Sequence, residues 1–211
     1  MPSPRAHARP RPGVCHHGGM SGTSAARRIF LVGPMGAGKT SVGRQLARRL
    51  GLEFVDADHE IESRTGVDIP YIFEVEGEAG FRERERRVLA ELTLRPGIVL
   101  ATGGGAILDE ANRKRLAACG TVVYLHASVD EQLRRTRGDR RRPLLQVPDP
   151  RARLAELMAV REPLYRAVAD LVVETDGRGV RSVVGEIVRR LPPPKPGERA
   201  GPAPEAGDTV V

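Results

Sequence analysis

Short apolar runs alternate along this chain with longer segments in which apolar residues recur at helical spacing. The runs are rich in Val, Ile and Leu, and they are Ile29–Val32, Leu52–Val55, Ile98–Ala101, Val122–Leu125 and Leu171–Val173. Strands that alternate with helices in this way indicate βαβ units, which build a parallel sheet. The pattern therefore predicts a three-layer α/β fold, with a central five-stranded parallel sheet flanked by helices.

The clearest helical pattern begins at Thr40 and ends at Leu50. Val42 and Leu46 precede Leu50 at i, i+4 and i+8, and Gly51 then favours a stop. Further helices are expected at Pro70–Glu76, Phe81–Leu94, Glu110–Ala118, Val129–Thr136, Arg151–Tyr165 and Val180–Arg190. A chain of 211 residues suits one such domain better than two, so one active site is expected.

Both ends of the chain lack this periodicity. Residues 1–26 consist largely of Pro, Arg, His, Gly and Ser, and residues 193–211 are rich in Pro. Such segments cannot bury enough apolar area to offset the entropy lost on ordering. We therefore expect a folded domain at 27–192 between two disordered tails.

The chain is basic, with a formal net charge of +7. A basic surface gains affinity for nucleic acid by releasing counterions from phosphates. Here the basic residues are nearly all Arg and are interleaved with acids, as the coding bias of a GC-rich genome produces. Aromatic residues make up only 3% and Trp is absent, which argues against stacking on bases as the main activity. We expect no nucleic-acid partner.

The sequence shows no targeting or membrane segment. No stretch of about 18 apolar residues occurs, and the N-terminal residues lack the apolar centre of a secretory signal. Cys15 lies in a tail and Cys119 in a predicted helix, so neither a disulfide framework nor a zinc site is expected. A cytoplasmic protein without a membrane partner is expected, and we also expect a monomer.

One segment carries a specific motif for phosphate binding. Gly33–Thr40 matches G-x-x-x-x-G-K-[ST] and lies between a predicted strand and a predicted helix. Its glycines let backbone N–H groups converge on phosphate oxygens at the positive end of the helix dipole. Lys39 would meet the β- and γ-phosphates, and Thr40 would bind Mg²⁺. The predicted ATP-binding residues here are Gly33, Gly36, Ala37, Gly38, Lys39, Thr40 and Ser41.

A P-loop identifies the phosphoryl donor but leaves the acceptor open, because GTPases, motor ATPases and small-molecule kinases share it. Asp56 and Asp58 follow the second strand, at the edge where ligands bind in open α/β folds, and alternation places both side chains on one side. No Asp follows the third strand, so Asp56 is the candidate for holding water around Mg²⁺. Asp58 is the candidate for accepting a proton from a substrate hydroxyl or orienting it. The alternative is an acidic N-cap of a helix.

Two further features are suited to an anionic acceptor. Arg82 and Glu85 stand at i, i+3, so the carboxylate can fix a guanidinium that captures a substrate carboxylate. The third strand ends at Gly103, Gly104 and Gly105, which let a small ligand touch main-chain N–H groups. The alternatives are a surface ion pair on a solvated helix and a flexible turn.

Taken together, these residues resemble the shikimate kinase family. Six features of that family occur here in order: the P-loop, Asp56-Ala57-Asp58, the Gly-Glu-x-x-Phe-Arg-x-x-Glu stretch at 77–85, the three glycines, Arg-Pro-Leu-Leu at 142–145 and Arg-x-Pro-Leu-Tyr at 161–165. The resemblance runs from about Arg28 to Leu191. The P-loop continues as Lys-Thr-Ser instead of the commoner Lys-Ser-Thr, which keeps the Mg²⁺ hydroxyl.

The resemblance implies a P-loop NTPase fold of the nucleoside monophosphate kinase type, with a short mobile lid at about 137–150. Arg142 would be the lid arginine that closes over the phosphates, and Arg135 would lie against adenine. Lys39, Asp58 and Arg142 would then be the catalytic residues. The two arginines at 82 and 161 would bind the carboxylate of shikimate, and its full set of binding residues would be Asp58, Arg82, Gly103, Gly104, Gly105 and Arg161. Without the family, 137–142 is a basic loop whose commonest explanation is solvation.

The expected reaction is transfer of a phosphoryl group from ATP, with Mg²⁺ as cofactor, to the 3-hydroxyl of shikimate. A kinase for gluconate or a nucleoside monophosphate is the nearest alternative, but neither explains two arginines matched to a carboxylate together with Asp58. An ATP-binding or nucleic-acid-binding protein without catalysis is the alternative from another class.

Overall fold

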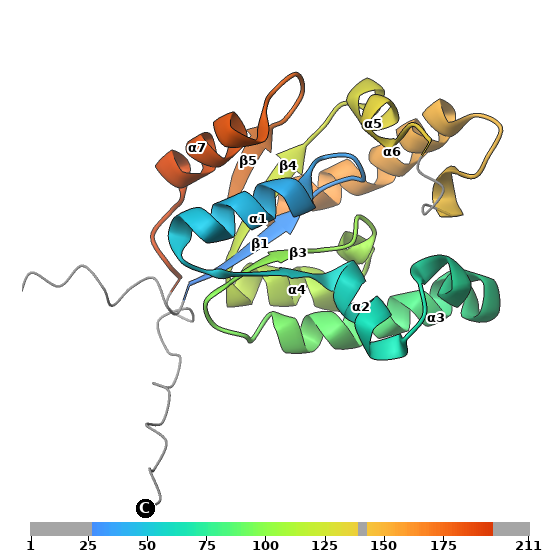
Figure 1. The fold of residues 1–211 in the computed structure, drawn as a ribbon, viewed down its shortest axis with the longest axis horizontal. Helices are drawn as coiled ribbons and strands as arrows, with labels where there is room; N and C mark the ends of the chain where they lie inside the picture. Colours follow the sequence, from blue (N-terminus) through green and yellow to red (C-terminus); the bar gives the residue numbers. More distant parts are fainter. Residues whose placement is uncertain (1–26, 139–142, 196–211) are drawn as a thin grey trace, which may run out of the picture.

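A parallel sheet of five strands forms the centre of the domain (Figure 1). The computed structural model describes residues 27–138 and 143–195. Every strand pair is parallel, and the strand order is β2-β3-β1-β4-β5. The strands are β1 (Arg28–Val32), β2 (Glu53–Asp56), β3 (Ile98–Ala101), β4 (Thr121–His126) and β5 (Leu171–Glu174). The predicted fold class is therefore confirmed, with each predicted strand shifted by no more than one residue at either end.

Helices cover both faces of this sheet (Figure 1). The α-helices are α1 (Lys39–Leu50), α2 (Ala57–Thr65), α3 (Ile69–Leu92), α4 (Glu110–Cys119), α5 (Val129–Thr136), α6 (Pro150–Val168) and α7 (Val180–Arg190). Short 3-10 helices lie at Ala106–Leu108 and Pro143–Leu145. Because all strands run in one direction, their carboxyl ends lie together at one edge of the sheet, and the loops that follow them meet there.

The core consists of two apolar layers, one on each side of the sheet. Successive side chains of a strand point to opposite faces, so Phe30 joins one layer and Leu31 the other. The first layer packs the sheet against α3, α4 and α6, and the second packs it against α1 and α7. Val, Ile and Leu supply most of both layers, in agreement with the low aromatic content.

Helices α2 and α3 differ in part from the prediction. The structure places helix α2 at Ala57–Thr65, a segment for which a helix was given only as the alternative. The two helices predicted at 70–76 and 81–94 are present as two parts of α3, which ends at Leu92 and is interrupted at Gly77 by non-helical backbone (φ 69°, ψ −177°). Glycine is the residue that adopts such an angle without strain, which explains the break.

Helix α6 continues past the position where the sequence analysis ended it. Pro163 lies inside α6, which runs to Val168 although proline removes one backbone donor. Arg161 and Tyr165, on either side of this proline, are both buried, so tertiary packing fixes this segment in spite of it.

Several predictions fall on residues outside the described ranges. The N-terminal tail at 1–26 and the segment 196–211 lie outside them, as do residues 139–142 of the predicted lid. At the C-terminal boundary the ordered contacts extend beyond residue 192, because the ammonium of Lys195 pairs with Asp170 over 2.8 Å and donates to the carbonyl of Ala117. None of the helices in residues 27–138 and 143–195 is long and apolar enough to cross a membrane.

Candidate active site

The loop between β1 and α1 has the geometry of a phosphate cradle. Gly33, Gly36 and Gly38 all have positive φ angles, of 142°, 75° and 87°. A Cβ on Gly33 would lie 2.4 Å from the backbone oxygen of Leu125, so only glycine fits there. These angles turn the loop so that it leads directly into the N-terminus of α1 at Lys39, where helix N–H groups have no intrahelical partner.

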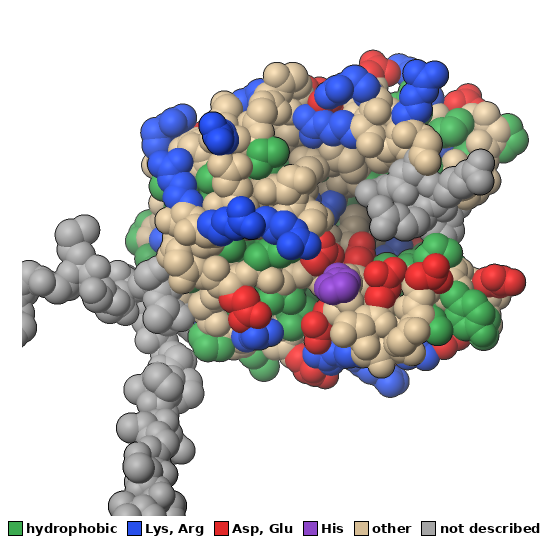
Figure 2. Space-filling model, viewed as in Figure 1, with side chains coloured by type: hydrophobic (Ala, Val, Ile, Leu, Met, Phe, Trp, Pro, Cys, Tyr) green, Lys and Arg blue, Asp and Glu red, His purple; other side chains and the backbone are tan. Residues whose placement is uncertain are grey.

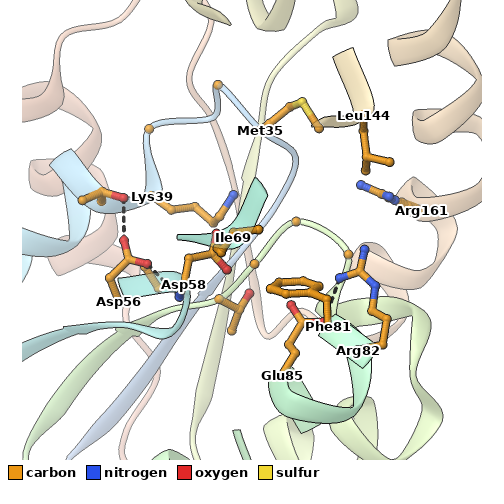
Figure 3. Close-up of a pocket in the computed structure, with 18 of the residues that line it drawn as sticks. Met35, Lys39, Asp56, Asp58, Ile69, Phe81, Arg82, Glu85, Leu144 and Arg161 are labelled. Atoms are coloured by element: carbon orange, nitrogen blue, oxygen red, sulfur yellow. Dashed lines mark hydrogen bonds and ion pairs between the residues drawn. The ribbon is translucent and has the colours of Figure 1, made fainter. Parts of the chain in front are cut away.

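The ammonium of Lys39 bends back over this loop. It donates to the carbonyl oxygens of Gly33 and Pro34 over 2.7 and 2.8 Å. In Figure 3 its side chain extends into the cavity from the start of α1. A lysine held at this point supplies a positive charge beside any phosphate that occupies the loop.

Thr40 and Asp56 form a pair of oxygen ligands suited to Mg²⁺. The Thr40 hydroxyl donates to Oδ2 of Asp56 over 2.8 Å, so its lone pairs stay available to a cation. Hydroxyl and carboxylate oxygens are hard donors of the kind that Mg²⁺ takes, alongside phosphate oxygens and water. Among the described residues no group of three or more His, Cys, Asp or Glu is arranged to hold a metal. The residues present therefore fit a cation shared with nucleotide phosphates.

Asp56 and Asp58 line the same cavity, but the predicted reason was wrong. Asp56 ends β2, whereas Asp58 belongs to the first turn of α2, so alternation along a strand does not relate them. Asp56 also caps α2 by accepting the backbone N–H of Asp58 over 3.1 Å. The helix-cap alternative thus describes Asp56 correctly, and the same carboxylate serves both the cap and Thr40 because its two oxygens point to different partners.

At the opposite end of the cavity, Arg82 is held by two carboxylates of its own helix. Its guanidinium pairs with Glu85 over 2.8 Å and with Glu78 over 2.9 Å, and the Glu85 side chain is only 1% exposed. Burial raises the pKa of Glu85 to about 7, an effect that the charge of Arg82 offsets only in part. The predicted Arg82–Glu85 contact is present, and burial distinguishes it from a surface ion pair.

Arg161 reaches the same end of the cavity from α6 (Figure 3). It is only 4% exposed, and burial lowers the pKa of its guanidinium, with the nearby charge of Arg82 adding to the effect. Within the described ranges no carboxylate lies at ion-pair distance from Arg161. A buried cation in that position is costly unless an anion binds beside it.

The glycine turn after β3 lies between these groups. A Cβ on Gly103 would lie 2.4 Å from Oε1 of Glu85, and a Cβ on Gly105 would lie 2.1 Å from Nη2 of Arg82. Glycines therefore let the charged side chains of α3 approach the turn closely. The turn then places backbone groups within reach of a ligand bound by the arginines.

One cavity of about 430 Å³ joins the two ends. It opens on the face shown in Figure 2, between basic side chains over α1 and acidic side chains over α2 and α3. The predicted residues that line it are Gly36, Gly38, Lys39, Thr40, Ser41, Asp56, Asp58, Arg82, Gly103, Gly104, Gly105, Arg135 and Arg161. Gly33 and Ala37 belong to the loop without lining the cavity, and Arg142 lies outside the described residues.

Several lining residues were not predicted as site residues. Most of them are apolar, and this apolar part of the lining, called the wall below, consists of Met35, Ile69, Phe73, Phe81, Ala101 and Leu144. Glu85 and Thr102 complete the lining. The sequence signals for this wall are Ile69 and Phe73 at i, i+4 on the helix that carries Arg82, and Phe81 and Leu144 within the family motifs. An apolar wall facing charged groups suits a small ring that bears both a carboxylate and hydroxyls.

Arg135 joins the P-loop to the loop after β5. Its guanidinium donates to the carbonyl of Gly36 over 3.0 Å and to the carbonyl of Thr175 over 2.7 Å, and it pairs with Glu131. This network holds the planar group beside the phosphate cradle.

The geometry brings together a phosphate site, an oxygen pair for a cation, and a buried cationic pocket separated from them by Asp58. Such an arrangement can align a phosphoryl donor with a hydroxyl of an anionic acceptor, which is what catalysis of phosphoryl transfer mainly requires.

Comparisons with known proteins agree with this geometry. The model of the shikimate kinase family matches residues 35–192. A shikimate kinase from Halorhodospira halophila is 63% identical over 164 residues, which cover 78% of this chain and 93% of the relative. One from Pseudomonas aeruginosa is 60% identical over 163 residues, with 77% and 95% covered.

Solved structures give the same result. The structure of a shikimate kinase from Acinetobacter baumannii in complex with shikimate is similar with a TM-score of 0.76 and 55% identity, covering 77% of this chain and 91% of that one. A gluconokinase from Sinorhizobium meliloti is similar with a TM-score of 0.50 but only 17% identity, over 78% of this chain and 90% of that one. That second likeness concerns the fold alone.

Proposed function

The chain belongs to the shikimate kinase family, and from this premise we infer that it transfers the γ-phosphoryl group of ATP to the 3-hydroxyl of shikimate, forming shikimate 3-phosphate. The observation that carries the choice of acceptor is Arg161, a buried cation with no carboxylate at ion-pair distance among the described residues. Together with Arg82 and the glycine turn, it provides a site for an anionic group at the correct end of the cavity.

Each residue has an assigned role. Arg82 and Arg161 bind the carboxylate of shikimate by charge-assisted hydrogen bonds, and Gly103, Gly104 and Gly105 border its ring. Asp58 faces the reacting hydroxyl and accepts its proton as the bond to phosphorus forms. The wall that includes Phe73 and Phe81 excludes water from the apolar face of the ring.

The nucleotide occupies the other end. Backbone N–H groups of the P-loop hold its phosphates, Lys39 neutralises charge on the transferring group, and Arg135 lies against the base. Thr40 and Asp56 would hold Mg²⁺, Asp56 through water, and the cation would supply positive charge beside the phosphates of the nucleotide. Arg142, which lies outside the described residues, is assigned to the lid at about 137–150, where it closes over the phosphates.

The gluconate alternative lacks a comparable argument. The gluconokinase likeness is of the fold only, whereas the shikimate kinases from Halorhodospira halophila and Acinetobacter baumannii are 63% and 55% identical to this chain. We further propose that the protein acts as a monomer in the cytoplasm, without nucleic acid or membrane partners. Light scattering after size exclusion tests the monomer.

The deciding experiment offers shikimate, gluconate and AMP separately with MgATP and measures ADP release. Turnover is expected with shikimate and with neither of the other two acceptors, and turnover with either of those but none with shikimate would overturn the assignment.

Arg161→Ala then tests the carboxylate site. It should weaken shikimate binding by about 10- to 100-fold and leave ATP binding nearly unchanged, because a buried charge-assisted contact is lost. Arg166→Ala, an exposed arginine of the same helix, is the matched control.

A further inference from the structure

Tyr165 lies directly behind the acceptor end of the cavity. It is one helical turn after Arg161 on α6, it is only 1% exposed, and it is not among the residues that line the cavity. Its hydroxyl nevertheless donates to the backbone oxygen of Gly104 over 2.5 Å, and the Arg161 guanidinium lies beside the same turn, with Nη1 3.8 Å from where a Cβ on Gly104 would lie. One buried phenol is therefore next to two groups assigned to shikimate.

A phenol can donate one hydrogen bond and also accept hydrogen bonds, so one hydroxyl can interact with both the turn and a guanidinium. Tyrosine has a single O–H proton, and here it goes to the carbonyl of Gly104, so the oxygen lone pairs remain for the N–H groups of Arg161. Burial raises the pKa of Tyr165 well above its usual value, which the charge of Arg161 offsets in part, so the proton stays on the oxygen at neutral pH.

The ring of Tyr165 is fixed as well. It stacks on Tyr124 of β4, with ring centroids 4.9 Å apart and planes 23° from parallel. Tyr124 is fully buried, and its hydroxyl has no hydrogen-bond partner among the described residues. The two phenols thus share one packed stack, but only that of Tyr165 makes polar contacts toward the site.

From this geometry we propose that Tyr165 is a positioning residue for the acceptor: its hydroxyl fixes the guanidinium of Arg161 relative to the glycine turn at Gly104. The proposal rests on the proposed function, because it assigns these two groups to shikimate. Arg161 has no carboxylate at ion-pair distance within the described ranges, so its orientation depends on the phenol and the turn beside it and not on a salt bridge. A misdirected guanidinium weakens the binding of the shikimate carboxylate and leaves the binding of ATP unchanged.

The test is Tyr165→Phe in the full chain, with KM measured separately for shikimate and ATP and shikimate affinity measured by calorimetry. KM and Kd for shikimate should rise about tenfold, since one buried hydrogen-bond network is lost. KM for ATP should stay within about twofold. The matched control is Tyr124→Phe, which removes a hydroxyl without a partner from the same stack and should leave both KM values unchanged.

A double-mutant cycle gives a second measurement that packing alone cannot imitate. If Tyr165 acts through Arg161, the loss of shikimate affinity caused by Tyr165→Phe should largely disappear in an Arg161→Ala background. Additive losses, an unchanged shikimate KM, or equal rises in both KM values would overturn the positioning role. If the unaltered chain does not phosphorylate shikimate at all, the proposed function has failed, which is a separate result.

Discussion

The hydroxyl of Thr40 donates a hydrogen bond to Oδ2 of Asp56 over 2.8 Å, which joins the first turn of α1 to the end of β2. The other oxygen of the same carboxylate accepts the backbone N–H of Asp58 and caps α2. One side chain therefore links the phosphate loop, the proposed cation site and the helix that carries the proposed base. A single substitution can separate the helix-capping role of this side chain from its proposed role at the cation site.

Asp56→Asn should raise the Mg²⁺ concentration needed for half-maximal activity by about 10- to 100-fold, the usual effect of changing a residue that supports a metal site. Asparagine caps helices about as well as aspartate, so the free energy of unfolding should change little. Activity at a series of Mg²⁺ concentrations checks the first expectation, and urea denaturation checks the second. Unaltered Mg²⁺ dependence would remove Asp56 from the cation site.

The same residue shows what the sequence could and could not predict. The P-loop was predictable because its glycines, lysine and threonine are contiguous and the flanking strand and helix follow from periodicity. The alternation argument for Asp56 and Asp58 assumed that the extended backbone continues to Asp58. Asp56 instead caps α2, so Asp58 already belongs to a helix.

The acceptor end depends on contacts between distant elements, and the sequence could only suggest it. Arg82 and Glu85 are near neighbours on one helix, so their contact was predictable from spacing. The approach of Arg161 to that pair, the hydrogen bond from Tyr165 to Gly104, and the wall formed by Phe73 and Phe81 depend on how α3 and α6 pack on the sheet. Family resemblance supplied Arg161, and its motifs also contain Phe81 and Leu144, but nothing in the sequence indicated that these two side chains line the cavity.

Glu85→Gln tests the electrostatics of this region. The folded-state pKa of Glu85, about 7, is above its ordinary value of 4.5, so between these limits the folded chain binds more protons than the unfolded one. Stability supplied by this group is therefore complete at low pH and is lost as pH rises, by at most about 1.4 kcal/mol per pH unit. The free energy of unfolding of the wild type should fall relative to that of the variant between pH 5 and 8.

Urea denaturation at several pH values measures that difference. Glu83→Gln, which removes a half-buried carboxylate of the same helix that pairs with Arg86 and Arg87, is the control. If the difference between wild type and Glu85→Gln were constant, or grew as pH rose, the carboxyl of Glu85 would titrate in its ordinary range and the burial argument would be wrong.

Gly105→Ala should disturb the acceptor site through Arg82. The backbone of Gly105 accepts alanine, with φ of −97°, but the added Cβ would lie 2.1 Å from Nη2 of Arg82 and would displace the guanidinium. KM for shikimate should rise about 10- to 100-fold, because misplacing a substrate-positioning group by about 1 Å has effects of that size. KM for ATP should change little.

The control for this substitution is Gly179→Ala, where a Cβ meets nothing within 4 Å and φ is −77°. It should leave both KM values unchanged. Steady-state kinetics for the two variants decide the matter: similar behaviour of Gly105→Ala and Gly179→Ala would show that the turn does not set the position of Arg82.

Arg135 and Arg134 offer the most direct test at the nucleotide end, since adjacent residues share one acidic partner but differ in what else they contact. Both pair with Glu131, yet the Arg134 side chain is 68% exposed, whereas Arg135 also donates to Gly36 and Thr175. Removing Arg135 frees the carbonyl of Gly36 in the phosphate loop and removes the planar group that we assign to the base. Arg135→Ala should therefore raise KM for ATP about tenfold while KM for shikimate stays nearly constant, since a charged group making buried hydrogen bonds is lost.

The control is Arg134→Ala, which removes an exposed ion pair and should have almost no effect on either KM. Equal effects of the two substitutions on KM for ATP would mean that Arg135 contributes only general positive charge, and its assignment to the base would have to be abandoned.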